Sequence, residues 1–271
     1  MKKDFTTGIG IFVSIGLTFA AIFETFGQLT IRIQGLLPSQ RLGIFFDIDS
    51  LIIVLGGTAG ALLVNFKFDD MKNFFSLAAQ ALTAPAQGDE AETIKQIVDL
   101  SQEARVNGLL ALEPKIKQIE SDFLRSGLEM VVDGTDTEVI RENMENELAY
   151  IQRRHLKGQQ FFLQAGAYCP SFGMVGTLVG LVIMMTDLSD IDMIASSMQV
   201  ALLTTFYGSL FANGIFLPIG GKLSILSSNE VALKELMIEG VLSIPKGENP
   251  KVLKNYLDTF VSPNKRLTDG Q

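Results

Sequence analysis

Two long stretches without a charged residue constrain this chain more than any other feature of its sequence. They are Gly158–Thr186 and Met193–Gly221, each 29 residues long. An α-helix rises about 1.5 Å per residue, so about 20 apolar residues cross the roughly 30 Å hydrocarbon core of a bilayer. Each stretch is therefore long enough to cross a membrane with room for tilt, and we expect an integral membrane protein.

Two further candidate spans precede these stretches. Gly8–Phe23 is uncharged and follows Lys2 and Lys3, and Ser50–Phe66 is uncharged as well. A basic start followed by an apolar run also fits a signal peptide, but this run is longer than a signal core, and we favour a retained anchor. The sequence thus predicts an all-α membrane protein with four transmembrane helices and a large helical cytoplasmic domain between the second and the third.

Lysine and arginine are distributed unevenly between the connecting segments. Residues 67–157 hold 11 of them and residues 222–271 hold 7, whereas residues 27–47 hold two and residues 187–192 hold none. Because cytoplasmic loops are enriched in these residues, we expect both termini and the large loop on the cytoplasmic side. The predicted division is 1–66 for the first two transmembrane helices with their outer loop, 67–157 for the cytoplasmic helical domain, 158–221 for the third and fourth transmembrane helices, and 222–271 for C-terminal cytoplasmic helices and a tail.

Helical periodicity recurs in the cytoplasmic segments. Apolar residues at helical spacing predict a helix over Ala91–Val106, and a second helix over Leu109–Ser126 follows the interruption at Gly108. Thr137–Lys157 is expected to run as a long helix into the third span. Two short amphipathic helices, Asn229–Leu242 and Pro250–Phe260, are expected after the fourth.

Several function classes lack the residues that they would need. The net charge is −8 and no basic stripe with interleaved aromatics is present, which argues against a nucleic-acid partner. The single Cys169 cannot form an intramolecular disulfide and is expected to be a packing residue. His155, the only histidine, is expected to be an exposed interfacial residue rather than a ligand or base. With no nucleophile–base pair and no metal cluster, we expect neither an enzyme nor a cofactor.

Hydroxyls and prolines are the informative polar features of the long stretches. Thr177 lies in the middle of the third span, and Thr204 and Thr205 lie in the middle of the fourth. Each hydroxyl can simply bond back to its own helix, or the three can line a polar strip whose oxygens suit a hard cation such as Na⁺. Pro170 and Pro218 are either structural bends or hinges that pass a change in the pore to the cytoplasmic domain.

No carboxylate, lysine or histidine lies at the centre of any of the four expected spans. A proton or sodium pathway normally needs an ionisable group at membrane depth. If this chain conducts ions, a partner must therefore supply the acid. Asp47 and Asp49 lie at the outer edge of the second span, where we expect them to cap the start of a helix.

Four strings carry a resemblance to a known family. They are Asp49–Ala61 (DSLIIVLGGTAGA), Ala104–Glu113 (ARVNGLLALE), Cys169–Leu181 (CPSFGMVGTLVGL) and Ala201–Leu223 (ALLTTFYGSLFANGIFLPIGGKL). Together with the order of spans and loops, they make the chain similar to the A subunits of bacterial flagellar stators, the MotA/PomA family. The resemblance covers roughly residues 5–260.

The resemblance implies an ion-driven torque generator of the bacterial inner membrane that serves motility and chemotaxis. In this family a pentameric ring of A subunits surrounds two B subunits (MotB/PomB-like), and each B subunit supplies the essential membrane aspartate. The cytoplasmic loop pushes on the rotor protein FliG, and here Arg105 and Glu113 match the charged pair that engages it. Val106 stands where the family often has a second basic residue.

The resemblance also bears on the coupling ion. Pro170 and Pro218 match the two family prolines, and Thr177, Thr204 and Thr205 match hydroxyls typical of the sodium-driven branch. We therefore expect a stator subunit that couples a flow of Na⁺ to torque on the rotor, with no metal beyond this transient ion. Two alternatives stay open: a proton-driven stator of the same family, and a stator-like membrane energiser or scaffold for non-flagellar machinery.

The connection Gly27–Asp47 is longer than the usual outer loop, and nothing in the sequence explains its length.

Overall fold

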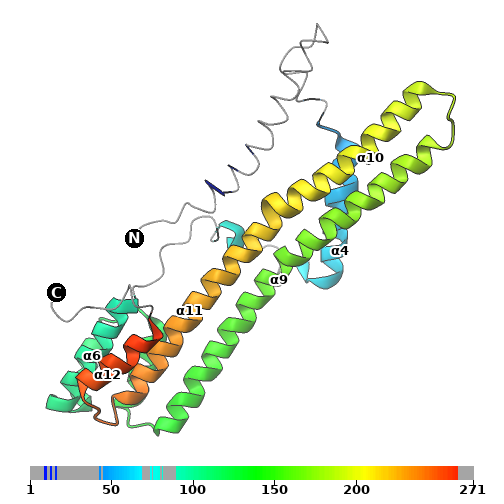
Figure 1. The fold of residues 1–271 in the computed structure, drawn as a ribbon. Helices are drawn as coiled ribbons and strands as arrows, with labels where there is room; N and C mark the ends of the chain where they lie inside the picture. The colour runs from blue at the N-terminus through cyan, green and yellow to red at the C-terminus, as the bar shows by residue number, and fades with distance from the viewer. Residues whose placement is uncertain are drawn as a thin grey trace. The chain divides into compact units, whose positions relative to one another are not determined.

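A computed structural model describes residues 45–68 and 90–261, together with the shorter pieces 9–10, 13, 16, 43, 74, 76–79 and 81. Every regular element in this described part is helical (Figure 1). The chain divides into two compact units. Unit 1 comprises Met1–Pro85 and Lys157–Ser224, and unit 2 comprises Ala86–Leu156 and Ile225–Gln271.

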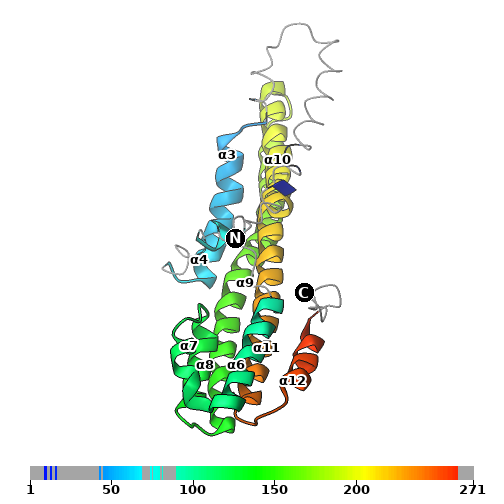
Figure 2. The same ribbon diagram turned by 90° about the vertical axis from the view of Figure 1, so that its left-hand side faces the viewer.

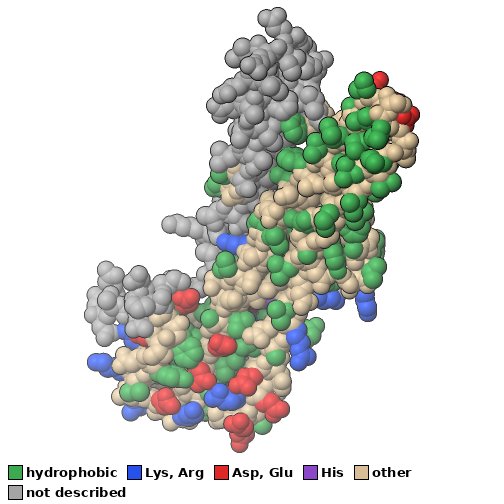
Figure 3. Space-filling model, turned by 45° about the vertical axis from the view of Figure 1, so that its right-hand side comes forward, with side chains coloured by type: hydrophobic (Ala, Val, Ile, Leu, Met, Phe, Trp, Pro, Cys, Tyr) green, Lys and Arg blue, Asp and Glu red, His purple; other side chains and the backbone are tan. Residues whose placement is uncertain are grey.

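Three helical runs are long and apolar enough to cross a membrane: Ile48–Asn65, Thr137–Met184 and Ile191–Ser243. They agree with the second, third and fourth expected spans, and the all-α fold class is confirmed. The first expected span, Gly8–Phe23, lies mostly outside the described residues, so the count of four stays a prediction. On the face shown in Figure 3, green hydrophobic side chains are numerous over the described part of unit 1, with acidic side chains at its tip, whereas acidic and basic side chains gather over unit 2.

Unit 1 is built from an antiparallel helix pair and a third helical run beside it. The pair consists of the second part of α9 (Thr137–Met184) and of α10 (Ile191–Phe211), which lie side by side in Figure 1. Asp190 ends the turn between them, because its carboxylate accepts the backbone N–H groups of Asp192 and Met193 at 3.0 and 3.1 Å. This N-cap satisfies donors that the first turn of α10 would otherwise leave unpaired.

The third run of unit 1 comprises α3 (Ile48–Leu51), the π-helix η1 (Ile52–Gly56) and α4 (Gly57–Asn65), which follow one another without a break. It packs against α10 and lies to one side of the pair in Figure 2. The prediction that Asp47 caps the start of this run is confirmed, since its carboxylate accepts the N–H of Ser50 at 2.8 Å. The same prediction is wrong for Asp49, which lies in the first turn of α3 rather than before it.

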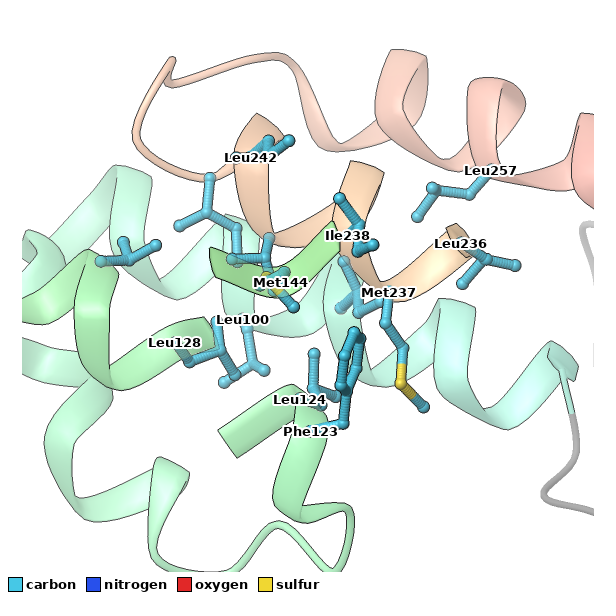
Figure 4. Close-up of a cluster of buried hydrophobic side chains, with 14 of the residues drawn as sticks. Leu100, Phe123, Leu124, Leu128, Met144, Leu236, Met237, Ile238, Leu242 and Leu257 are labelled. Carbon is cyan, nitrogen blue, oxygen red and sulfur yellow. The ribbon is translucent and has the colours of Figure 1, made fainter. Parts of the chain in front are cut away.

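Unit 2 is a helical domain around one apolar core. Its elements are α6 (Glu90–Asn107), the 3₁₀ helix η2 (Leu109–Leu112), α7 (Glu113–Ile116), α8 (Asp122–Val132), the first part of α9, the second part of α11 (Leu217–Ser243), α12 (Pro250–Leu257) and the 3₁₀ helix η4 (Asp258–Phe260). Figure 4 shows leucine, methionine and phenylalanine side chains from these helices pointing toward one another. Leu124, Leu128, Leu242, Leu253 and Leu257 are each completely buried there.

Two helices differ from their expected bounds. The single helix expected over Leu109–Ser126 is wrong, because the chain leaves the helical path between Ile116 and Asp122. Ile116 and Ile119 are both 3% exposed, so this segment turns its apolar side chains into the core instead of continuing straight. The Ser121 hydroxyl then accepts the N–H of Leu124 at 3.3 Å and starts α8 anew.

The helix expected over Asn229–Leu242 is likewise not separate, since it forms the second part of α11. Uninterrupted helix thus continues from the fourth expected span into unit 2. The sequence therefore contains no start signal at Asn229, because a segment that continues an existing helix needs no N-cap of its own.

His155 also differs from its expected exposed position. Its side chain is 19% exposed, with Nδ1 3.1 Å from the Ser227 hydroxyl and Nε2 3.9 Å from the Glu230 carboxylate. Burial lowers the pKa of His155 below its usual value, against the opposing pull of Glu230, and Arg154 and Lys234 lower it further.

This depressed pKa has a consequence for stability. A folded-state pKa below the unfolded value means that the neutral imidazole stabilises the fold fully above the unfolded pKa of about 6.5. That contribution is lost as the pH falls through the folded pKa. We expect the melting temperature of the detergent-solubilised protein to fall more between pH 7.5 and pH 5 than that of His155→Gln, which keeps a neutral hydrogen-bonding side chain. Identical pH profiles for the two proteins would contradict this expectation.

Candidate functional site

The central parts of α9 and α10 approach each other through glycines. A Cβ added at Gly173 would lie 2.8 Å from the backbone oxygen of Thr204, and one added at Gly208 would lie 2.7 Å from that of Cys169. A Cβ at Gly180 would lie 2.6 Å from the backbone oxygen of Ser197. Small residues allow backbones to pack this closely in membranes, where association depends on van der Waals contact. The two helices therefore have a fixed register along this seam.

This register brings two of the three predicted ion-pathway threonines together. The Thr177 hydroxyl and the Thr205 hydroxyl form a direct hydrogen bond. The Thr177 hydroxyl also lies 3.0 Å from the Ala201 carbonyl oxygen and 3.1 Å from the Gly173 carbonyl oxygen. Four oxygen atoms thus converge on one point of the seam, and oxygen is the ligand that hard cations prefer.

Thr204 lies apart from this pair although it is adjacent to Thr205 in the sequence. Its side chain is completely buried, and its hydroxyl donates into its own helix, toward Val200 (2.9 Å) and Ala201 (3.1 Å) carbonyl oxygens. Its remaining atoms fill the space beside Gly176. The geometry therefore favours packing for Thr204, whereas Thr205 is exposed along the flank of the helix pair.

Two polar residues that the sequence reasoning missed continue from Thr205 to the C-terminal end of α10 and just beyond it. Thr205, Ser209 and Asn213 follow at four-residue spacing and are all exposed. The Asn213 amide donates to the Ser209 carbonyl at 3.0 Å and lies 3.3 Å from the Ser209 hydroxyl. Residues four apart share one helix face. We call these three residues the polar stripe; their spacing within a charge-free stretch was the signal that could have identified it.

The two predicted hinge prolines lie at different kinds of position. Pro170 lies within the continuous helix α9, beside Gly208 of α10, whose added Cβ would come within 3.1 Å of the Pro170 Cα. Pro218 follows the π-helix η3 (Ala212–Phe216), which separates α10 from α11. A proline lacks the N–H that would bond one turn back, and a local π-turn is one way in which a helix accommodates that loss. Asn213 of the polar stripe lies in this π-helix.

Tyr207 fixes the third helical run against α10. Its side chain is 5% exposed, and its hydroxyl accepts the N–H of Asp47 at 2.9 Å while donating to the Phe45 carbonyl. Both partners lie directly before α3, so one hydroxyl holds the segment in which this run begins. Aromatic contacts with Phe206 and Phe211 surround the ring.

We expect Tyr207→Phe to lower the free energy of unfolding by about 1–3 kcal/mol, since it removes two hydrogen bonds to half-buried backbone groups, each worth about 0.5–1.5 kcal/mol. Thermal unfolding of the detergent-solubilised protein measures this loss. Tyr150→Phe is the matched control, because Tyr150 is 69% exposed. Equal melting temperatures for both variants would show that the Tyr207 hydroxyl does not hold α3.

The predicted rotor-facing residues flank a sharp corner in unit 2. Arg105 lies in the last turn of α6 and Glu113 in the first turn of α7, and both are exposed. Between them, Gly108 has φ 84° and ψ 165°, a backbone region open essentially only to glycine. The ion pair across the corner joins Lys115 to Glu103 at 2.6 Å, and this hydrogen bond lowers the pKa of Glu103. The corner thus presents both predicted residues to solvent.

The described residues contain no group of three or more His, Cys, Asp or Glu side chains that could hold a metal ion. The oxygens that converge beside Thr177 are hydroxyl and carbonyl oxygens without charge. An ion that passes there needs a counter-charge from elsewhere.

Comparisons with known proteins identify the family. The family model described as the MotA/TolQ/ExbB proton channel family matches residues 115–236. Motility protein A of Borreliella burgdorferi is 40% identical over 225 residues, which cover 83% of this chain and 86% of that protein. Chemotaxis protein PomA of Vibrio alginolyticus is 34% identical over 253 residues, covering 93% and 99%. An uncharacterized protein of Bacillus subtilis, YtxD, is 40% identical over 218 residues, covering 80% of each chain.

Solved structures agree with these relatives. A chain of the flagellar MotAB stator complex from Bacillus subtilis matches with a TM-score of 0.77 and 29% identity, covering 95% of this chain and 100% of that one. A chain of MotAB from C. jejuni has the same fold, with a TM-score of 0.81 at 24% identity and coverage of 98% and 99%. The chain belongs to the MotA/TolQ/ExbB family and, within it, to the flagellar stator A subunits of the MotA/PomA type.

Proposed function

We propose that this stator subunit couples a flow of Na⁺, through a complex with a B-type subunit, to torque on the flagellar rotor. The observation that carries the proposal is the hydroxyl pair of Thr177 and Thr205 at the glycine-packed seam of α9 and α10. Hydroxyl and carbonyl oxygens can replace part of the hydration shell of Na⁺. A proton, by contrast, needs no such cluster of neutral oxygens.

The B-type subunit would complete this site. Na⁺ at membrane depth needs a negative charge, and the charge-free stretches of this chain hold none. The solved relatives are MotAB complexes, which supports a partner of the same kind here. The polar stripe supports such a partner, since Thr205 and Ser209 of α10 and Asn213 of η3 are exposed and offer hydrogen-bonding groups to a helix that carries a carboxylate.

The remaining parts of the proposal follow from the resemblance to the family. We place both termini in the cytoplasm of the bacterial cell, four helices across the inner membrane and five copies of this chain around the B subunits. Pro170 and Pro218 would act as the hinges that pass a change beside Thr177 to unit 2. Arg105 and Glu113 would contact the rotor protein FliG, since both lie exposed at the corner around Gly108.

Co-expression tests the need for a partner. The chain is produced in a stator-deficient bacterium alone, or together with a single-span protein that carries an early membrane aspartate and is encoded beside it. We expect swimming only when both are present, and loss of swimming when that aspartate is replaced by asparagine. Swimming with the chain alone would contradict the proposal that a partner supplies the acid.

A proton-driven stator is the second candidate, and the description of the matching family as a proton channel favours it. In that case the hydroxyl pair would serve helix packing. Motility that ignores external Na⁺ and stops with a protonophore would select this function. A stator-like energiser of other machinery is the third candidate. Loss of function in Arg105→Glu that is rescued by a reciprocal charge in FliG would exclude it, and unchanged function of Arg105→Glu would favour it.

A further inference from the structure

A hollow of about 690 Å³ lies between α6 and α12 in unit 2. We call it the basic groove, and its lining residues are Val98, Gln102, Arg105 and Val106 of α6, with Asn249, Pro250, Lys251 and Lys254 at and within α12. Lys251 and Lys254 are far from Arg105 in the sequence. The packing of α12 on α6 brings the three cations to one place.

The charge of this groove is unusual for the chain. Its lining contains three cations and no carboxylate, although the protein carries a net charge of −8. A second hollow of the same unit shows the contrast, because Glu92, Asp99, Glu120 and Glu230 line it together with only two lysines. Electrostatic complementarity selects partners and speeds their approach. The basic groove therefore favours a negatively charged partner.

Apolar side chains in the groove narrow the kind of partner. Val106 is 74% exposed at one wall, and Val98 and Pro250 also line the hollow. Such an exposed valine beside three cations suits a partner that presents apolar and acidic side chains next to each other. An amphipathic helix commonly binds by laying its apolar face into a groove between two helices, and the basic groove has that form. A free phosphate would use the cations and leave the apolar wall without a role.

Helix α12, which forms one wall of the groove, is anchored in the core of unit 2. Leu253 and Leu257 of α12 are completely buried in the core of unit 2. Asn249 caps the helix by accepting the N–H of Lys251 at 3.0 Å, and the Tyr256 hydroxyl donates to the Glu239 carboxylate at 3.4 Å. A contact on α12 is therefore transmitted to the helices that it packs against rather than absorbed by a loose tail.

We propose that the basic groove receives an acidic, amphipathic helix of the rotor-side partner, with Lys251 and Lys254 of α12 adding to Arg105 of α6. This rests on the proposed rotor contact of Arg105 and extends it to the C-terminal helix. The sequence has a valine at position 106, directly after its one arginine in this turn. In this arrangement α12 supplies further positive charge, and Val106 supplies the apolar wall.

The test is a charge reversal with a matched control. The double variant Lys251→Glu/Lys254→Glu changes the groove, whereas Lys95→Glu/Lys246→Glu makes the same charge change at exposed lysines outside it. The A/B complex of each variant is titrated with the purified rotor protein. We expect the groove variant to bind about tenfold more weakly and the control to change less than twofold. We expect the single variant Lys251→Glu, which leaves the less exposed Lys254 in place, to lose part of this binding affinity.

A photo-crosslinking amino acid at position 106 identifies what occupies the groove. We expect crosslinks that map to an acidic helix of the rotor protein, and none from Val139, which is exposed on α9. Replacing the carboxylates of the crosslinked helix by lysine should restore binding to the groove variant. Restored binding supports the proposal, whereas crosslinks to a neutral or basic segment overturn it.

The remaining outcomes separate this inference from the function on which it rests. If Arg105→Glu abolishes binding while the groove variant binds like its control, the rotor contact stands and the groove proposal is wrong. If Arg105→Glu also binds normally, the proposed rotor contact itself is wrong. The groove variant is also tested for binding to vesicles with anionic lipid and to inorganic phosphate. If it loses either of these while it binds the rotor protein normally, the groove binds a phosphate-bearing ligand and the proposal is overturned.

Discussion

Replacing Gly208 by alanine should stop rotation and destabilise the protein. The added Cβ would lie 2.7 Å from the Cys169 carbonyl oxygen, 3.1 Å from the Pro170 Cα and 3.2 Å from the Gly173 Cα. All three are backbone atoms, so no side chain can turn away to make room. Overpacking of this kind costs about 1–3 kcal/mol. The separation of α9 and α10 would also pull Thr177 away from Thr205.

Gly221→Ala is the matched control for this prediction. A Cβ at Gly221 meets no heavy atom within 4 Å, while both substitutions gain the same helix propensity over glycine. Any difference between them therefore reports packing along the seam. Rotation speed and the melting temperature of the solubilised A/B complex measure it. Gly208→Ala that rotates and melts like Gly221→Ala would show that the close approach of α9 and α10 is dispensable.

Removing the hydroxyl of Thr177 or Thr205 should weaken the response to Na⁺ strongly. Valine keeps the shape of threonine and deletes one of the four oxygens that would face the ion. The loss of one such contact is worth about 1–1.5 kcal/mol, or roughly a tenfold rise in the Na⁺ concentration for half-maximal speed. We expect Thr177→Val and Thr205→Val to swim poorly at limiting Na⁺ and to recover partly at high Na⁺, whereas serine at either position should restore the response.

Thr204→Val provides the internal control. Its hydroxyl is buried and bonds within its own helix, so its loss should leave the Na⁺ dependence unchanged. The structure thus divides three threonines that the sequence grouped together. Equal shifts for Thr204→Val and Thr205→Val would contradict this division, and a normal Na⁺ response of Thr205→Val would exclude its hydroxyl from the pathway.

Much of the fold follows from composition along the chain. Insertion into a bilayer depends on long apolar windows, so Gly158–Thr186 and Met193–Gly221 predicted two of the three described spans directly. The cap at Asp47 and the interruption at Gly108 depend on a few adjacent residues and were also predicted correctly. Membership of the stator family confirms that the chain is not an enzyme.

The candidate site was predictable only in part. Thr204 and Thr205 are neighbours in the sequence but point about 100° apart around the helix, and which of them meets Thr177 depends on how α10 is rotated against α9. The same limit applies to His155, whose burial comes from Ser227 and Glu230 on α11. Tertiary packing sets these relationships, and periodicity within one helix does not contain them.

Long-range packing also explains why the sequence reasoning missed the basic groove. Lys251 and Lys254 lie in an eight-residue helix whose buried leucines carry the periodic signal. Nothing in that helix indicates that α6 will lie beside it. The cations become part of a site only because Leu253 and Leu257 seat α12 in the core next to Arg105.

The dependence of rotation speed on external Na⁺ tests the central claim most directly. The chain and its B-type partner drive single tethered cells of a stator-deficient host at constant pH, with and without a protonophore. A sodium-coupled stator predicts that speed rises with external Na⁺ and saturates, and that rotation persists when the protonophore is present. Speed that is independent of Na⁺ and rotation that stops with the protonophore would contradict it.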